Sequence, residues 1–352
     1  MVTIDGKNTV DQDKVDQMLK RGYELGINYF DTAYLYNDGQ SEIAVGRAVK
    51  SFRKDILVSS KSPSHLIKKP GDYRRILEEQ LKKLDMDYID FYHFHGIRYE
   101  SFLSIDKNAN WLKEAQQAKE EGLIKHISFS CHDKPENMIK LIDMGCFESV
   151  LCQYSAIDRS NEEAIAYAKA KGLGTVVMGP LGGGRVSGLP KEIAQQLGLK
   201  VKSSVEMAFR FVFANSNINC ALSGMENLKM VEENCEISLN GEPLSAEEVQ
   251  AVNDLMAENK RLSELYCTGC AYCVPCPKGV NIPEIFKMMN YYKIYKIEDY
   301  AKGGYNNIGK YNWAPPGKQA DACVDCGVCE TKCPQKIKIR EQLKESHRAL
   351  SR

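Results

Sequence analysis

267-CTGCAYCVPCP-277 and 323-CVDCGVCETKCP-334 hold eight of the 13 cysteines in this chain of 352 residues. The second stretch has the spacing C-x2-C-x2-C-x3-C-P, in which three thiolates from one short loop bind one cubane and the fourth reaches a different cluster. The first stretch is one residue shorter before its last cysteine. Zinc also binds thiolate-only sites, but a zinc ribbon needs two CxxC knuckles and leaves the third and fourth cysteines of each stretch unexplained. Two such stretches together therefore indicate iron–sulphur clusters.

The two stretches resemble the two-[4Fe-4S] module of ferredoxins, and the resemblance covers about the last quarter of the chain. In that module each cluster takes three thiolates from one stretch and its fourth from the other. The resemblance therefore implies one cluster held by Cys267, Cys270, Cys273 and Cys333, and a second held by Cys323, Cys326, Cys329 and Cys276. Pro275 and Pro277 favour an extended backbone at Cys276, which would lead this thiol away from its own loop. The segment 282–301 has apolar and tyrosine residues at helical spacing, so we expect a largely helical, ferredoxin-like domain over residues 259–352.

Charge and composition exclude several classes of partner. The chain has 47 basic and 47 acidic residues, so nothing in its charge points to nucleic acid or a membrane surface. No apolar run has the length of a membrane-spanning helix, and the first residues lack the apolar core of a signal peptide. Cysteines at cluster spacing without an export signal predict a cytoplasmic protein. The other cysteines are scattered, and we expect them to be buried as small apolar residues: Cys131, Cys146, Cys152, Cys220 and Cys235.

Before the cysteine stretches, short apolar runs alternate with amphipathic helical segments. The apolar runs are rich in β-branched and aromatic residues, as strands buried on both faces are. They predict strands at 28–33, 55–60, 88–95, 124–130, 149–154, 174–179 and 218–224. The helices are expected at 12–25, 40–52, 72–84, 109–121, 134–144, 160–171, 203–214 and 226–236, and a further one at 245–260 starts with the capping box Ser245–Glu248. Strict alternation predicts an α/β fold with a parallel sheet inside a ring of helices.

The number of strands is one short of a closed (β/α)8 TIM barrel. The helix at 12–25 comes first, without the strand that should lead into it. An open barrel would have two long unpaired edges, which is a liability for a protein. We therefore expect a (β/α)8 barrel over residues 1–258 whose first strand is missing because the start of the chain is truncated.

The barrel segment is identified as a member of the aldo/keto reductases by a series of motifs. The first is GINYFDTAYLYNDGQSEIAVGRAV (26–49), in which an aspartate and a tyrosine five residues apart precede a helix that opens on Ser-Glu. Others are VSSK (58–61), DYIDFYHFH (87–95), ISFS (127–130), CQY (152–154), MGPLGGG (178–184) and SGMENLKMVEEN (223–234). The resemblance spans residues 12 to about 258 and implies that Asp31, Tyr36, Lys61 and His95 occupy the catalytic positions.

The chemistry of carbonyl reduction fits these four residue types. The reaction needs a hydride donor and an acid for the carbonyl oxygen, and a tyrosine serves as that acid when an ammonium stabilises its phenolate. Lys61 supplies the ammonium, Asp31 keeps it charged, and His95 orients the substrate oxygen. All four follow or end strands at their C-terminal side, where such barrels place their chemistry. His93 is expected to be a core histidine, and Tyr34 a packing residue.

The resemblance also implies a nicotinamide cofactor, NADPH or NADH. Ser130 and Gln153 fall where the family contacts the carboxamide, although Cys131 replaces the usual asparagine. The loop with Pro180, Leu181 and Gly183 would follow the pyrophosphate, because glycines let backbone N–H groups approach phosphate. Glu233 and Asn234 match the adenine side. The basic residues that usually hold a 2′-phosphate are replaced by Gly224, Met225 and Met230, so the sequence leaves the choice of cofactor open.

The sequence therefore predicts an oxidoreductase that reduces an aldehyde or ketone, or oxidises an alcohol, with NAD(P)H, and that carries two [4Fe-4S] clusters for electron transfer or structure. Nicotinamide passes two electrons as hydride whereas each cluster passes one, so a redox partner protein is a further candidate partner besides the small-molecule substrate. The alternative is an iron–sulphur electron-transfer or redox-sensing protein whose barrel is a non-catalytic scaffold.

Overall fold

A computed structural model describes residues 3, 9–182, 199–264, 267, 272–311, 313–333 and 336–351, with the side chains of 259–264 excepted. The chain divides into two compact units. The first comprises Met1–Pro180 with Phe209–Pro243, and the second Leu181–Ala208 with Leu244–Arg352. The domain boundary expected at residue 258 stays a prediction. No helix in the described ranges is both long and apolar enough to cross a lipid bilayer.

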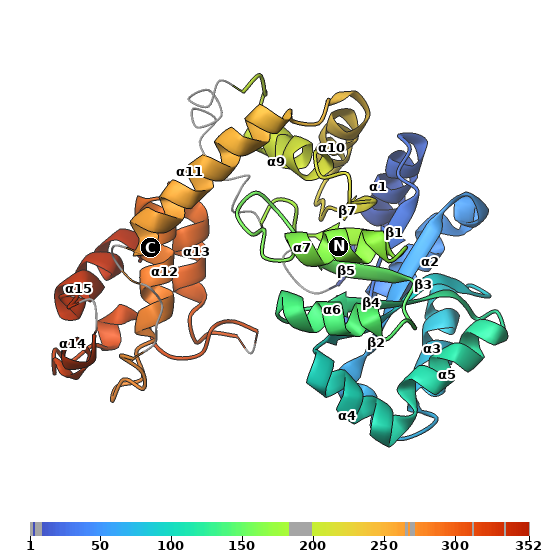
Figure 1. The fold of residues 1–352 in the computed structure, drawn as a ribbon, viewed down its shortest axis with the longest axis horizontal. Helices are drawn as coiled ribbons and strands as arrows, with labels where there is room; N and C mark the ends of the chain where they lie inside the picture. The colour runs from blue at the N-terminus through green and yellow to red at the C-terminus, as the bar shows by residue number, and fades with distance from the viewer. Residues whose placement is uncertain are drawn as a thin grey trace. The chain divides into compact units, whose positions relative to one another are not determined.

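The first unit is built on one sheet of seven parallel strands in the order of the sequence (Figure 1). The register runs through pairs such as Phe30 with Val58 and Tyr92 with Ile127, and every strand pairs with the next along the chain. The strands are β1 (Tyr29–Asp31), β2 (Leu57–Pro63), β3 (Ile89–Ile97), β4 (Ile124–Cys131), β5 (Ser149–Gln153), β6 (Gly174–Met178) and β7 (Cys220–Leu222). All seven coincide with predicted runs, which confirms the (β/α)8-type architecture.

Helices connect successive strands, as parallel pairing requires, and two further helices precede the first strand and follow the last. They are α1 (Gln12–Glu24), α2 (Ser41–Val49), α3 (Asp72–Leu84), α4 (Tyr99–Ala109), α5 (Trp111–Glu120), α6 (Pro135–Asp143), α7 (Glu162–Ala170), α9 (Ser204–Phe213) and α10 (Leu228–Asn240), with 3-10 turns η1 (Lys50–Asp55) and η2 (Ser64–Leu66). Helix α4 was not expected. It is separated from α5 by Asn110, whose left-handed backbone (φ 52°) breaks the helix between Ala109 and Trp111.

The sheet is left open between its first and last strands. Within the described residues β1 and β7 do not pair, and a cleft of about 650 Å³ lies between them, walled by α1 and α10. Its lining is mainly apolar and includes Met18, Ile27, Leu222 and Val231. The described part of the chain thus shows the seven predicted strands of a nearly closed barrel.

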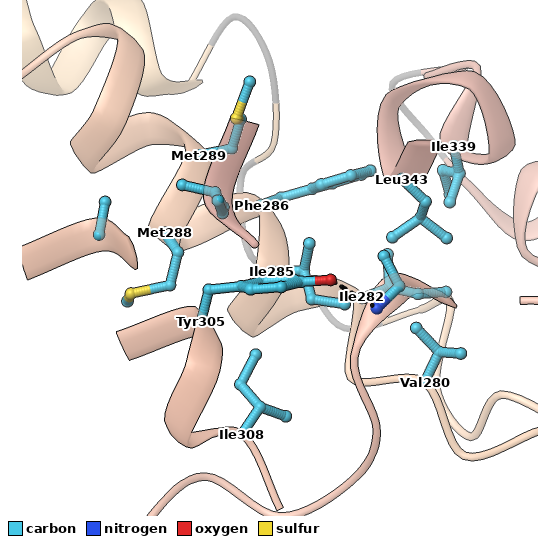
Figure 2. Close-up of a cluster of buried hydrophobic side chains, with 13 residues drawn as sticks. Val280, Ile282, Ile285, Phe286, Met288, Met289, Tyr305, Ile308, Ile339 and Leu343 are labelled. Carbon is cyan, nitrogen blue, oxygen red and sulfur yellow. Dashed lines mark hydrogen bonds between the residues drawn. The ribbon is translucent and has the colours of Figure 1, made fainter. Parts of the chain in front are cut away.

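The second unit is helical and has its own apolar core. It contains α11 (Ala246–Glu264), α12 (Ile282–Lys293), α13 (Glu298–Asn307), η3 (Ala320–Ala322), α14 (Val328–Lys332) and α15 (Ile339–Leu350). Helix α11 begins with the predicted capping box, in which Glu248 N donates to Ser245 Oγ and Ser245 N to Glu248 Oε2. Figure 2 shows Tyr305 amid the core side chains of α12, and its hydroxyl accepts a hydrogen bond of 3.1 Å from Ala320 N.

Candidate functional site

An ion pair lies where β1 and β2 end. Lys61 Nζ is 2.5 Å from Asp31 Oδ2 and donates to the carbonyl oxygen of Thr32 at 2.8 Å. Asp31 Oδ1 accepts a third hydrogen bond from Ser59 Oγ at 2.6 Å. Lys61 is only 2% exposed, so its charge has this carboxylate as its counter-ion. The ammonium is therefore held in one place.

Tyr36 and His95 lie beside this ion pair. Lys61 Nζ is 4.9 Å from the centre of the Tyr36 ring, and the Tyr36 and His95 rings meet edge to face with centroids 6.2 Å apart. Tyr36 is 41% exposed, which leaves its ring accessible from solvent. Burial, and secondarily the Lys61 charge, lowers the pKa of His95 to about 4. The imidazole is therefore neutral near pH 7. The structure thus brings all four predicted catalytic residues together.

A buried polar network supports the end of β2. Sequence patterning predicted continuously apolar strands, but Ser59, Ser60, Lys61 and Ser62 are all buried. Ser60 Oγ donates to Glu42 Oε1 at 2.6 Å, and the Gln80 amide donates to both of these residues and to the carbonyl oxygen of Lys61. Polar groups are tolerated in a core when they are hydrogen-bonded to one another. This network, which sequence reasoning did not find, locks the backbone that carries Lys61.

His93 belongs to the core, as expected. It is fully buried, and its Nε2 lies 3.4 Å from the Tyr29 hydroxyl. Its Nδ1 has no hydrogen-bond partner among the residues that the structure describes. Burial lowers the pKa of His93 to about 3. Tyr34 is likewise a packing residue, because its hydroxyl donates to Glu79 at 2.8 Å and its ring lies under the Lys83 ammonium.

The two residues proposed for the carboxamide lie at the ends of β4 and β5. Gln153 is exposed, and its side-chain amide has no hydrogen-bond partner in the part of the chain that the structure describes. Ser130 is buried, and its hydroxyl accepts a hydrogen bond of 2.7 Å from Gly96 N. A free amide at a strand end fits a carboxamide ligand, whereas the Ser130 hydroxyl is already engaged by β3.

The remaining cofactor candidates divide between the loop after β6 and α10. Pro180 and Leu181 lie in a turn after Gly179, whose φ of +65° favours glycine. Gly183 falls outside the described residues. On α10, Lys229 Nζ is 3.6 Å from Glu233, and Asn234 Nδ2 donates to Ser223 Oγ at 3.1 Å. The only lysine near the missing basic positions in sequence is thus paired with a carboxylate.

The cysteines of the second unit gather on its apolar core. Six of the predicted ligands pack against it: Cys267, Cys273, Cys276, Cys323, Cys329 and Cys333. Cys326 is exposed, and Cys270 lies outside the described residues. One small cavity is lined by Cys276, Cys323, Cys326 and Cys329, together with apolar residues of the core. A second cavity lies at Cys267, between α12 and α15.

This arrangement fits a cluster better than a single metal ion. Among the described residues, no three cysteine, histidine or carboxylate side chains converge closely enough to hold one ion. Four thiols nevertheless line one cavity, and they are the three from the second stretch with the last from the first. A cubane spreads its thiolates apart at its corners, whereas tetrahedral zinc draws them to about 2.3 Å from one centre.

Comparisons with known proteins identify the families of two parts of the chain. Residues 1–257 match the sequence profile of the aldo/keto reductase family, and residues 266–337 match that of a 4Fe-4S dicluster domain. L-galactose dehydrogenase of Arabidopsis thaliana is 27% identical over 252 residues, which are 64% of this chain and 78% of that protein. The NADH-specific methylglyoxal reductase of Escherichia coli is 28% identical over 193 residues, 49% of this chain and 58% of that protein.

Solved structures of aldo/keto reductases resemble the barrel part of this chain. An aldo-keto reductase from Bacillus halodurans in its holo form superposes with a TM-score of 0.60 at 26% identity, over 69% of this chain and 87% of that one. An aldo/keto reductase from Klebsiella pneumoniae in complex with NADP and acetate shares the fold, with a TM-score of 0.59 at 22% identity over 73% of this chain and 90% of that one.

Proposed function

The chain belongs to the aldo/keto reductase family, and on this premise we propose that it reduces an aldehyde or ketone, or oxidises the alcohol, with Tyr36 as the acid–base residue. Family membership makes the protein an oxidoreductase, and its C-terminal unit carries a dicluster domain for two [4Fe-4S] clusters. The observation that supports the proposal is the buried Asp31–Lys61 pair with its ammonium 4.9 Å from the Tyr36 ring. The cysteine chemistry also favours a reducing, cytoplasmic setting.

A nicotinamide cofactor, NADPH or NADH, would supply the hydride when bound, and the residues of the chain handle the proton and the substrate. Tyr36 donates its hydroxyl proton to the carbonyl oxygen as negative charge develops there. Lys61 stabilises the phenolate that remains, since opposite charges attract strongly in a buried site. Asp31 keeps the lysine charged and in place. His95, neutral because its pKa is lowered to about 4, donates an N–H to the same oxygen and orients the substrate.

Cofactor contacts are proposed from the strand ends. Gln153, with its free amide, would hold the carboxamide. Ser130 would have a secondary role beside it, because its hydroxyl already accepts a hydrogen bond from Gly96 N. Pro180, Leu181 and Gly183 would follow the pyrophosphate, and Glu233 and Asn234 the adenine side. For the clusters, the packing of six thiols on the apolar core supports a structural role alongside electron transfer to a redox partner protein.

The proposal is tested by NADH- and NADPH-dependent turnover of a broad panel of aldehydes and ketones. Tyr36→Phe should lower turnover by about 10²–10⁴-fold, since it removes only the acid, and should leave nicotinamide binding nearly unchanged. Tyr34→Phe is the matched control, because Tyr34 hydrogen-bonds Glu79 and should keep its activity. Undiminished turnover in Tyr36→Phe would rule out the mechanism, and no turnover of any carbonyl by the native protein would favour the scaffold alternative.

A further inference from the structure

Two basic side chains that the sequence did not single out lie at adjacent strand ends beside the proposed acid. Ile97 of β3 is the register partner of Cys131 of β4, and Arg98 and His132 directly follow these two residues. A Cβ built on Gly96 would lie 3.6 Å from His132 Cδ2. The His132 ring therefore covers the backbone next to His95, whose ring contacts Tyr36.

The Arg98 side chain is exposed, and no ion pair within 4.0 Å holds it among the described residues. Its charge still helps to lower the pKa of the nearby Asp133 carboxyl, after the hydrogen bonds that this carboxyl accepts. The neighbouring carboxylate, Asp133, already accepts from Tyr99 N at 3.0 Å, Lys134 N at 2.8 Å and Asn137 Nδ2 at 3.0 Å. Asp31, deeper in the site, is likewise occupied by Lys61 and Ser59. Both acids therefore have hydrogen-bond donors other than Arg98, and the exposed guanidinium keeps its own N–H donors for a ligand.

A third histidine adds to the same side of the site. His65 follows β2 by two residues, and the last residue of that strand, Pro63, is the register partner of His95. Burial and the Lys61 charge lower the pKa of His95, the Asp31 charge raises it, and His132 and His65 lower it further. Burial, and secondarily the Arg98 charge, also lowers the pKa of His132, so its ring is neutral near pH 7. The exposed Arg98 is therefore the charged group on this side of the site that would attract an anionic ligand.

We propose that the substrate is a carbonyl compound with a carboxylate or phosphate group, which Arg98 and His132 bind while the carbonyl oxygen lies at Tyr36 and His95. The inference rests on the proposed function and names the substrate class for that site. Arg98 contributes a planar fork of N–H donors suited to either anion. His132 contributes a ring N–H. Both are specificity-determining residues, since the hydride and proton chemistry does not need them.

The experiment compares matched pairs of anionic and neutral substrates: succinic semialdehyde with butanal, and glyceraldehyde 3-phosphate with glyceraldehyde. The native protein should show a higher kcat/KM for the anionic member of at least one pair. A preference in the succinic semialdehyde pair indicates a carboxylate, and a preference in the glyceraldehyde 3-phosphate pair indicates a phosphate. Arg98→Gln should raise KM for that anionic substrate by roughly ten- to hundred-fold, as expected for a lost charged hydrogen bond. It should leave kcat and the neutral substrate within about two-fold. His132→Gln should act in the same direction and more weakly.

Arg47→Gln is the control, because this exposed arginine pairs with Asp16 on the outer helices and should change neither substrate. Equal use of anionic and neutral aldehydes by the native protein would overturn the substrate class while leaving carbonyl reduction intact. An equal loss for both substrates in Arg98→Gln would show a structural role instead. If no aldehyde is reduced, calorimetric binding of 4-hydroxybutyrate against 1-butanol decides the matter: binding of the anion that Arg98→Gln abolishes supports the inference, and no such preference overturns it.

Discussion

At the scale of single residues, His93 makes the barrel sensitive to acid. It is fully buried, its Nδ1 has no hydrogen-bond partner in the described part of the chain, and burial lowers its pKa to about 3. The unfolded chain binds a proton at this residue below about pH 6.5, whereas the folded chain does not until about pH 3. Stability is therefore lost as the pH falls through this window, by about 2 kcal/mol at pH 5 from this residue alone. His93→Gln should flatten the pH dependence of the unfolding free energy between pH 6.5 and 5, measured by chemical denaturation.

At the scale of elements, we expect the start of α10 to govern the choice between NADH and NADPH. Lys229 is paired with Glu233 at 3.6 Å, and Met230, half exposed, stands where a cation for a 2′-phosphate is expected. The dissociation constants for NADH and NADPH should thus differ by less than about 100-fold, or 2.7 kcal/mol. Met230→Arg should tighten NADPH relative to NADH by about ten-fold, because an arginine fork suits phosphate, and Met230→Leu should not. A native preference above 100-fold would show that another cation holds the phosphate.

At the scale of the whole molecule, we expect the helical unit to depend on clusters that its two cysteine stretches share. The cavity lined by Cys276 with three thiols of the second stretch supports the exchange of fourth ligands. Anaerobically purified protein should hold about eight irons. Cys333→Ala should damage the cluster of the first stretch and spare that of the second, as followed by iron content and electron paramagnetic resonance. Cys146→Ala, at a half-buried cysteine of the barrel, should change neither. Loss of only the second-stretch cluster in Cys333→Ala would show that each stretch binds its own cluster.

The expected burial of the scattered cysteines is met in part. Cys131, Cys152 and Cys235 are buried, while Cys146 and Cys220 are half-buried. Cys220 belongs to β7, at the open edge of the sheet, and lines the cleft there. Sequence spacing identifies a strand residue as apolar, but only the pairing of that strand decides how deeply the residue is covered.

The sequence by itself determined the seven strands, most helices of the barrel and the four residues of the Asp31–Tyr36–Lys61–His95 site. These features depend on local signals: apolar runs, helical periodicity, caps and the position of a residue at the end of its strand. It also predicted the cluster ligands, because the spacing of the cysteines is typical of a [4Fe-4S] module, and this ligand set stays a prediction. Helix α4 was not predicted, because the break that separates it from α5 depends on Asn110 adopting a left-handed backbone.

Only the tertiary structure decided which groups share a space. The buried network of Glu42, Ser60 and Gln80 joins α2, β2 and α3. The periodicity of the sequence does not predict this network, because polar residues in a strand ordinarily indicate an exposed face. Arg98 and His132 are 34 residues apart in sequence, and the register of β3 with β4 alone makes them neighbours. Strand pairing brings residues that are far apart along the chain into contact across the sheet. The register of that pairing cannot be predicted from either strand alone.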